Sequence, residues 1–97
     1  MDVLVLVEAK NYQKVSEMLK GDEVVSLASL VFKDAREFGK EGYYYCWVSG
    51  LESQCKKALE LVKDLAREVT GNEKEAFIKK MEEDENKAIE GFGAILG

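Results

Sequence analysis

The fold is decided by an aromatic stretch between two glycines, Gly42-Tyr43-Tyr44-Tyr45-Cys46-Trp47-Val48-Ser49-Gly50. Aromatic and β-branched residues favour strands, so this stretch predicts a strand that the two glycines delimit. Side chains alternate between the two faces of a strand. One face should therefore carry Tyr43, Tyr45 and Trp47, and the other should carry Tyr44, Cys46 and Val48.

The segment that follows predicts an amphipathic helix over residues 51–69. Its apolar residues recur at intervals of four and three, while the opposite side of the helix is charged. The apolar positions are Leu51, Cys55, Ala58, Val62, Leu65 and Val69. Ser49 and Glu52 have the spacing of a capping box, which would begin the helix. The pattern is typical of a half-buried helix that lies on a sheet.

An unbroken apolar run at residues 3–7 predicts a first strand that is covered on both faces. Asn11 is placed to act as the N-cap of a short helix, because its side-chain oxygen can accept a hydrogen bond from a backbone N–H. Gly21 stands where that helix is expected to end.

Residues 22–42 fit two patterns, and periodicity alone does not choose between a strand and a helix. We favour a strand over residues 24–32, because its β-branched start and the aromatic strand that follows suit a hairpin. Asp34 should then cap one short turn at residues 35–38, which Gly39 closes.

A third helix is expected over residues 73–90, with Asn72 as its cap. The acidic run at residues 82–85 interrupts its apolar stripe, so the middle of this helix should be solvated. The apolar residues at 92–96 fit either a short final strand or a packed tail.

These elements predict a single α+β domain over residues 1–97. The order β–α–β–β–α over residues 2–69 matches the ferredoxin-like arrangement, an antiparallel sheet with helices on one face. Residues 72–97 would add a C-terminal helix and tail. The expected core consists of Val3, Val5, Val7, Val15, Leu19, Val31, Cys46, Val48, Cys55, Leu59, Val62 and Leu65.

Three stretches, residues 29–39, 42–45 and 55–60, resemble small uncharacterised archaeal-type proteins with a ferredoxin-like fold. The resemblance implies this fold and an intracellular setting. It implies no particular activity.

Composition excludes several classes of activity. The chain has no histidine, which removes the commonest general acid–base group and the commonest metal ligand. Its 14 Lys and Arg against 19 Asp and Glu give a net charge of −5, and an acidic surface disfavours nucleic acid. No apolar run is long enough to cross a bilayer, so we expect a cytoplasmic protein without a membrane partner. No cofactor motif is found, and no cofactor is expected.

The two cysteines, Cys46 and Cys55, have three interpretations. Free cysteine usually behaves as a small buried hydrophobe, and this is the interpretation that we favour. A redox-active or disulfide-bonded pair stays open. Two thiolates without histidine are only half of a zinc site, so no metal is expected.

The aromatic strand is the candidate working surface. If Cys46 and Val48 pack beneath the helices, then Tyr43, Tyr45 and Trp47 form a large aromatic face, which monomers seldom leave uncovered. We therefore expect these three residues to face an interface or a ligand in a homo-oligomer, with a dimer favoured. Two alternatives are that they form the core face or that residues 73–97 cover them.

The sequence favours a non-catalytic, self-associating module that binds a small ligand or a protein partner. A second class is a small enzyme that uses Tyr, Lys and carboxylates, for example Lys33 with Asp34. A third class is an RNA-binding sheet, which the acidic charge and Glu41 in place of a basic residue disfavour.

Overall fold

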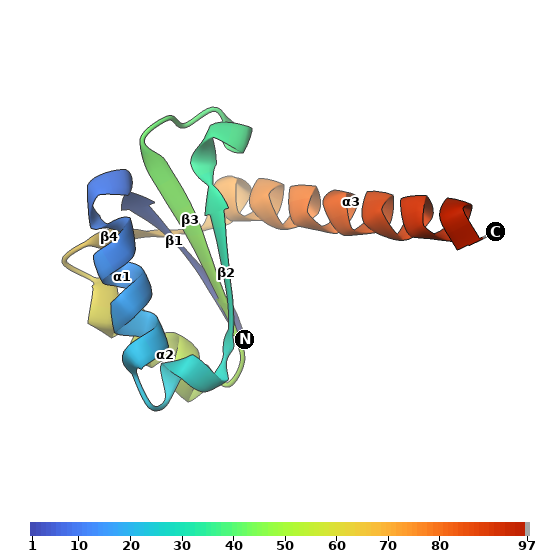
Figure 1. Cartoon of the computed structure of the whole chain (residues 1–97). Helices are drawn as coiled ribbons and strands as arrows, with labels where there is room; N and C mark the ends of the chain where they lie inside the picture. Colours follow the sequence, from blue (N-terminus) through green and yellow to red (C-terminus); the bar gives the residue numbers. More distant parts are fainter. Residues whose placement is uncertain (97) are drawn as a thin grey trace.

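The computed structural model describes the backbone of residues 1–96 and the side chains of residues 1–84. It is a mixed α+β structure with a four-stranded antiparallel sheet (Figure 1). Its elements are β1 (Asp2–Glu8), α1 (Ala9–Gly21), the 3-10 turn η1 (Val25–Leu27), β2 (Ser29–Asp34), the 3-10 turn η2 (Ala35–Phe38), β3 (Tyr43–Ser49), α2 (Glu52–Val62), β4 (Ala66–Val69) and α3 (Gly71–Leu96).

The strands lie in the order β2-β3-β1-β4, and each pair of neighbours is antiparallel. In the register, Leu6 of β1 stands opposite Tyr45 of β3 on one side and Arg67 of β4 on the other. Residues 3–7 of β1 are all buried, which confirms that this run is a strand covered on both faces.

One face of the sheet packs against α1 and α2 (Figure 1). Its buried residues are Val3, Val5, Val7, Val15, Leu19, Val25, Cys46, Val48, Cys55, Ala58 and Val62. Most of the core expected from sequence is therefore buried. Val31, Leu59 and Leu65 are the exceptions, since they are only partly buried.

The other face is covered by η2 and by the first turns of α3 (Figure 1). The buried residues there are Leu4, Leu6, Ala35, Tyr45, Val69 and Phe77. The expectation that the helices of the body lie on one face therefore holds for α1 and α2, and the added C-terminal helix α3 covers the opposite face. Beyond its first turns, α3 projects away from the sheet, and the longest dimension of the molecule is 46 Å against 29 and 25 Å.

The prediction of one helix over residues 51–69 was wrong in its second half. The helix α2 ends at Val62, and Ala66–Val69 forms β4. Val69 pairs with Leu4 and Ala66 pairs with Val7, so this segment takes the edge of β1 that β3 leaves free. Pairing with that edge outweighs the helical spacing, since strand preference depends on neighbours.

The predicted strand over residues 24–32 was displaced. Asp22 Oδ1 accepts hydrogen bonds from the N–H groups of Val24 and Val25, each at 2.9 Å, and this begins η1 instead of a strand. The strand β2 follows at Ser29–Asp34. The cap at Asp34 is confirmed, because its side chain accepts from Arg36 N–H and Gly39 closes the turn at φ 81°.

The predicted helix starts also need correction. The helix α1 begins at Ala9, so Asn11 is not its N-cap. Before α2, the side chain of Gln54 accepts a hydrogen bond from Leu51 N–H at 2.8 Å, in place of the expected box of Ser49 and Glu52. These caps depend on the residue at which each helix begins, which periodicity fixes only to within a turn.

The C-terminal helix is longer than the expected 73–90. The backbone of α3 is helical from Gly71 to Leu96, so no strand forms at 92–96. The packing of those side chains and the conformation of Gly97 lie outside the described residues.

Candidate functional site

The three candidate aromatic residues lie on the sheet face away from α1 and α2. Tyr45 is 1% exposed, Trp47 is partly buried, and Tyr43 is 39% exposed. Since Tyr45 is buried, this face is not an open aromatic patch. The sequence allowed the alternative that residues 73–97 cover these aromatic residues. The structure agrees with this alternative for Tyr45 and Trp47, which lie against Phe77.

Phe77 is the fully buried residue of α3 that, together with η2, covers this face. Its side chain is fully buried and lies among three aromatic rings, Phe38, Tyr45 and Trp47, which we call the aromatic cluster. The ring centroids are 5.2 Å from Phe38, 5.1 Å from Tyr45 and 5.7 Å from Trp47. These spacings are typical of favourable aromatic pairs. Phe77 therefore anchors α3 to the sheet.

A first polar contact holds the beginning of α3 at Glu73. The phenol of Tyr45 donates a hydrogen bond to Glu73 Oε2 at 2.8 Å. The guanidinium of Arg67 contacts Glu73 Oε1 at 3.4 Å, and Lys40 Nζ lies 3.9 Å from Glu73 Oε2. The carboxylate thus joins β3, β4 and the segment after η2 to one turn of α3.

A second polar contact lies at the N-terminal end of β1. Lys74 Nζ donates to the carbonyl oxygen of Asp2 at 3.0 Å and lies 3.4 Å from its Oδ1. The other carboxylate oxygen of Asp2 accepts a hydrogen bond from Trp47 Nε1 at 2.8 Å. Lys74 is therefore linked through Asp2 to the same aromatic cluster that holds Phe77.

The protonation states follow from these contacts. Burial, together with the bond to Glu73, raises the pKa of Tyr45 above that of a free phenol. The hydrogen bond from Tyr45 and the neighbouring Arg67 lower the pKa of Glu73 below its ordinary value of 4.5. The pair is therefore a neutral phenol on a carboxylate at neutral pH. Neither group has the pKa near neutrality that a general acid or base needs.

No protein-family model, curated protein or solved structure matches this chain. The candidate site is therefore interpreted from its own residues.

Cys46 and Cys55 are both buried and unbridged. Burial raises the pKa of Cys46 to about 12, so its thiol stays protonated and unreactive. The thiol of Cys55 lies 3.7 Å from the carbonyl oxygen of Val48, to which it can donate. These contacts are those of structural cysteines.

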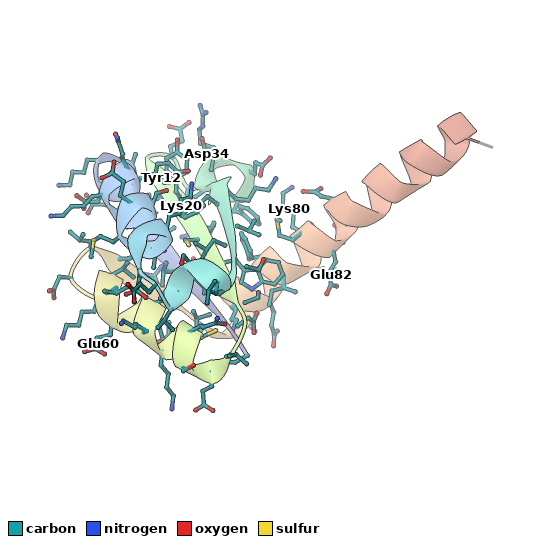
Figure 2. All side chains as sticks on the ribbon, turned by 60° about the horizontal axis from the view of Figure 1, so that its bottom comes forward. Tyr12, Lys20, Asp34, Glu60, Lys80 and Glu82 are labelled. Carbon is teal, nitrogen blue, oxygen red and sulfur yellow. The ribbon has the colours of Figure 1, made fainter. Side chains whose placement is uncertain are left out.

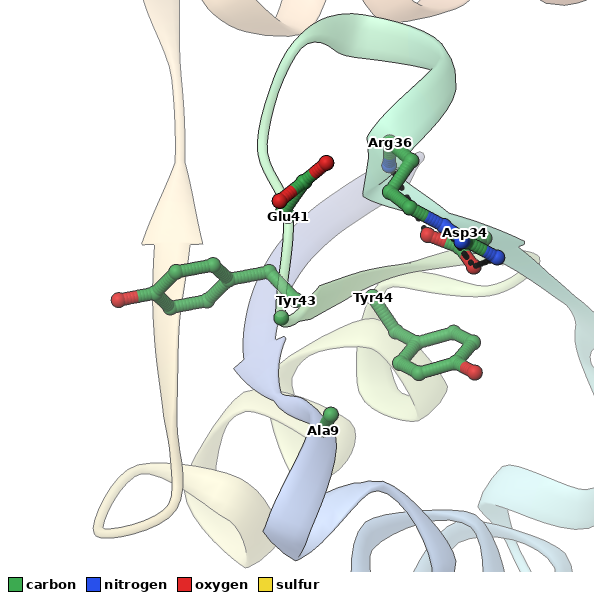
Figure 3. Close-up of a pocket in the computed structure, with 7 residues that line it drawn as sticks. Ala9, Asp34, Arg36, Glu41, Tyr43 and Tyr44 are labelled. Atoms are coloured by element: carbon green, nitrogen blue, oxygen red, sulfur yellow. Dashed lines mark hydrogen bonds and ion pairs between the residues drawn. The ribbon is translucent and has the colours of Figure 1, made fainter.

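An open groove lies beside Tyr43, where β1 ends and β3 begins (Figure 3). Tyr43 lines two pockets, one of about 360 Å³ and one of about 350 Å³. The first is lined by Ala9, Asp34, Arg36, Glu41, Gly42, Tyr43 and Tyr44. The second is lined by Leu6, Glu8, Asn11, Tyr43, Lys63, Asp64, Leu65, Ala66 and Arg67.

Two of the charged residues in the first pocket, Asp34 and Arg36, are paired with each other. Arg36 Nε donates to Asp34 Oδ2 at 3.1 Å, and hydrogen bonds from the backbone and side chain of Arg36 lower the pKa of Asp34. Lys33, its sequence neighbour, takes the opposite face of β2, because side chains alternate along a strand. Lys33 and Asp34 therefore do not converge on one site.

The side chains of residues 1–84 contain no group of three or more Cys, Asp or Glu placed to hold a metal ion. In the described part of the chain, no helix is both long and apolar enough to span a membrane.

Sequence reasoning missed Phe77 as the residue that completes the aromatic face. Its signal was present, because Phe77, Ile78 and Met81 have the spacing of one helix face. The buried residues on the α3 side of the sheet, Leu4, Leu6, Ala35, Tyr45, Val69 and Phe77, form what we call the second core cluster, and Ile78 and Met81 pack against it. Beyond Met81 the chain leaves the body, and Figure 2 shows Lys80 and Glu82 where α3 departs.

Proposed function

We propose that this chain is a non-catalytic module with a ferredoxin-like body that self-associates through α3. The element order β-α-β-β-α-β before α3 and the strand order β2-β3-β1-β4 support the ferredoxin-like assignment. In this proposal the assembly holds a small ligand or a protein partner, and the groove beside Tyr43 is the candidate place for it. The buried free thiols are compatible with a reducing compartment, which supports a cytoplasmic location.

One observation carries the proposal: α3 is much longer than the sheet face that it covers. The helix spans Gly71–Leu96, or about 39 Å at 1.5 Å per residue. Among the residues whose side chains the structure describes, Met81 is the last residue of α3 that packs against the second core cluster. Residues 82–96 therefore extend about 22 Å past the last of these contacts. We call them the overhang.

The sequence of the overhang supports a helical partner. Ile89, Phe92 and Leu96 are spaced by three and four residues, as on one face of a helix. A helix of this length is marginal in water by itself, and most helical stability comes from packing an apolar face. A second copy presents the same sequence, so two overhangs can form a symmetric contact.

The magnitudes are compatible with a reversible dimer. Burying each of these three side chains stabilises by roughly 1.5–3 kcal/mol. Two copies would then gain roughly 9–18 kcal/mol from six such side chains. Association costs about 4–15 kcal/mol in lost freedom of motion. The difference allows a dissociation constant in the micromolar range, which corresponds to about −8 kcal/mol.

The titrating groups support a non-catalytic function. Among the side chains of residues 1–84, the carboxylates with shifted pKa values are Asp2, Asp22, Asp34 and Glu73, and all four are shifted downward and stay charged. The shifts at Tyr45 and Cys46 are upward, and both groups stay neutral. Active sites usually bring such values towards the working pH.

Light scattering on the full chain over a range of concentrations tests the proposal. We expect a dimer at high micromolar concentration that dissociates on dilution. Phe92→Glu should abolish the dimer, while the matched variant Asn86→Glu, which adds the same charge at a polar position of the overhang, should retain it. A monomeric wild-type chain at high micromolar concentration, or equal behaviour of the two variants, would refute self-association through α3.

A further inference from the structure

We propose that the free edge of β2 pairs in antiparallel fashion with β2 of a second copy, so that the two four-stranded sheets join into one. This inference rests on the proposed self-association through α3 and adds a second contact to the same dimer. The interaction surface is the outer edge of Ser29–Asp34, and its partner is the same edge of another copy of this chain.

The sheet has two free edges, and one of them is protected. Across the described backbone, residues 1–96, β2 ends the sheet on one side and β4 ends it on the other. The strand β4 has only four residues, and the charged side chains of Arg67 and Glu68 are exposed. Short edge strands that carry charges resist pairing with another chain. The edge of β4 is therefore poorly suited to an interface.

The edge formed by β2 has few of these protections. This strand has six residues, contains neither glycine nor proline, and pairs with β3 in an unbroken register. Its charged residues, Lys33 and Asp34, stand together at its end. In its middle, Leu30 and Phe32 lie on the face of α1 and α2, whereas Val31 lies on the face of α3. All three are only partly buried, so a further strand would cover apolar surface on both faces.

An exposed leucine continues this apolar surface beyond the strand. Leu27 is 79% exposed, which makes it the most exposed large apolar side chain among residues 1–84. It precedes Ser29, the first residue of β2, by two positions. Contiguous apolar surface that stays exposed often marks an interaction site. The surface that we propose to be covered therefore runs from η1 onto the edge of β2.

The sequence of β2 fits a second copy of itself. When a two-fold axis passes through Val31, perpendicular to the sheet, each residue stands opposite a residue of its own face, because the two positions differ by an even number. Val31 then meets Val31 of the second copy, and Leu30 meets Phe32. Lys33 meets Ser29, so no like charges stand opposite each other. The strand is thus self-complementary, as a two-fold symmetric contact requires.

The position of α3 is compatible with this pairing. Figures 1 and 2 show that α3 leaves the body beside β2 and η2, and Lys80 Nζ of α3 lies 5.7 Å from the ring centroid of Phe38 in η2. A two-fold axis perpendicular to the joined sheet keeps both copies of α3 on the same face. One axis can therefore relate the two overhangs and the two strands in one closed dimer.

The edge contact is too small to hold a dimer alone. A strand of six residues spans about 20 Å, whereas a stable interface buries about 800 Å² on each partner. We therefore expect β2 to pair only in the dimer that α3 forms.

Disulfide trapping in the full chain tests the pairing and its register. Val31→Cys places two thiols opposite each other at the axis, with Cα atoms about 4.5–5.5 Å apart, which suits a disulfide. Ser29→Cys is the matched control, because residue 29 lies on the same face of β2 and is more exposed. Its two copies would stand four positions apart along the edge, or about 13 Å. The native Cys46 and Cys55 are buried and do not contribute.

After mild oxidation, we expect Val31→Cys to run as a covalent dimer on a non-reducing gel and Ser29→Cys to remain mostly monomeric. If light scattering shows a dimer but Val31→Cys links no better than Ser29→Cys, the pairing of β2 is refuted and self-association through α3 survives. If the chain is monomeric at high micromolar concentration, both proposals fail.

Amide hydrogen exchange followed by NMR provides a second measurement that leaves β2 unchanged. Successive N–H groups of a strand point to opposite sides, so some amides of β2 face away from β3. We expect these amides to exchange at least about tenfold more slowly in the wild-type dimer than in Phe92→Glu, because exchange then requires the paired strands to open. The outward amides of β4 should exchange equally in both proteins. Equal rates for β2 as well would overturn the proposal.

Discussion

Replacing Phe77 with alanine should destabilise the protein by about 3–5 kcal/mol, as is usual for a buried phenylalanine. The side chain is 0% exposed, and burial of such a side chain contributes about 1.5–3 kcal/mol. Its pairs with Phe38, Tyr45 and Trp47 each add about 0.5–1.5 kcal/mol beyond burial. The range known for buried phenylalanine and the sum of the burial and aromatic terms overlap. The expected loss in the free energy of unfolding is therefore large compared with that of ordinary surface substitutions.

Urea unfolding at one fixed protein concentration measures this loss. Trp47 is the only tryptophan of the chain, and its ring contacts Phe77. Its fluorescence therefore reports on the site of the substitution, while far-UV circular dichroism reports on the whole backbone. Phe77→Leu is the matched control, because it keeps an apolar side chain and should lose clearly less stability than alanine.

A loss below about 1 kcal/mol for Phe77→Ala would refute the reasoning, since this is the effect of an average substitution. It would mean that α3 does not cover the aromatic cluster in solution. Tyr45 and Trp47 would then be open to solvent, and the original expectation of an exposed aromatic face would return.

Three further predictions concern the polar contacts and the thiols. Tyr45→Phe removes the donor to Glu73 and should lower the free energy of unfolding by about 1–2 kcal/mol in urea, and an unchanged value would mean that this bond does not form. The pKa values of Asp2 and Glu73 are lowered in the folded state from 3.8 and 4.5, so their stabilisation is complete above those values and is lost as the pH falls below them. Thermal melts from pH 7 to 3 should show this loss, and Glu73→Gln should flatten the profile; an equally steep profile in the variant would count against the assignment. Neither Cys46 nor Cys55 should react with a thiol reagent in the native protein, and both should react in denaturant; fast native reaction would contradict their burial.

The sequence predicted the parts of the fold that local patterns determine. The alternation in residues 43–48 correctly placed Cys46 and Val48 under the helices, because every second side chain of a strand shares a face. The turn capped by Asp34 and closed by Gly39 was also predicted, since both residues act within a few positions of themselves. Such features need no knowledge of the rest of the chain.

The strand β4 could not be predicted in the same way. Val62, Leu65 and Val69 have the spacing of one helix face. In the structure, however, Val62 ends α2, Leu65 lies in a turn, and Val69 belongs to β4. What decides between these readings is the free edge of β1, to which Ala66 and Val69 pair. The free edge of β1 belongs to residues 2–8, which are far from residues 51–69 in the sequence. The spacing of apolar residues within 51–69 therefore carries no information about this pairing.

For the candidate site, the sequence predicted which residues share a face of the sheet but not whether that face is exposed. Alternation placed Tyr43, Tyr45 and Trp47 on one face, but whether this face is open depends on Phe77, about thirty residues further along the chain. The sequence offered coverage by the C-terminal segment as one alternative among several. The groove beside Tyr43 was not predicted, because its lining comes from four separate segments of the chain, residues 6–11, 34–36, 41–44 and 63–67.

The central position of β1 has a consequence for how the protein opens. Val3, Val5 and Val7 belong to the core beneath α1 and α2, whereas Leu4 and Leu6 belong to the core beneath α3. Detachment of α3 would expose one side of this strand and leave the other side packed. Native-state hydrogen exchange should therefore divide the molecule into two cooperative units. The amides of α3 would exchange through a partial opening, and those of β1 only through global unfolding.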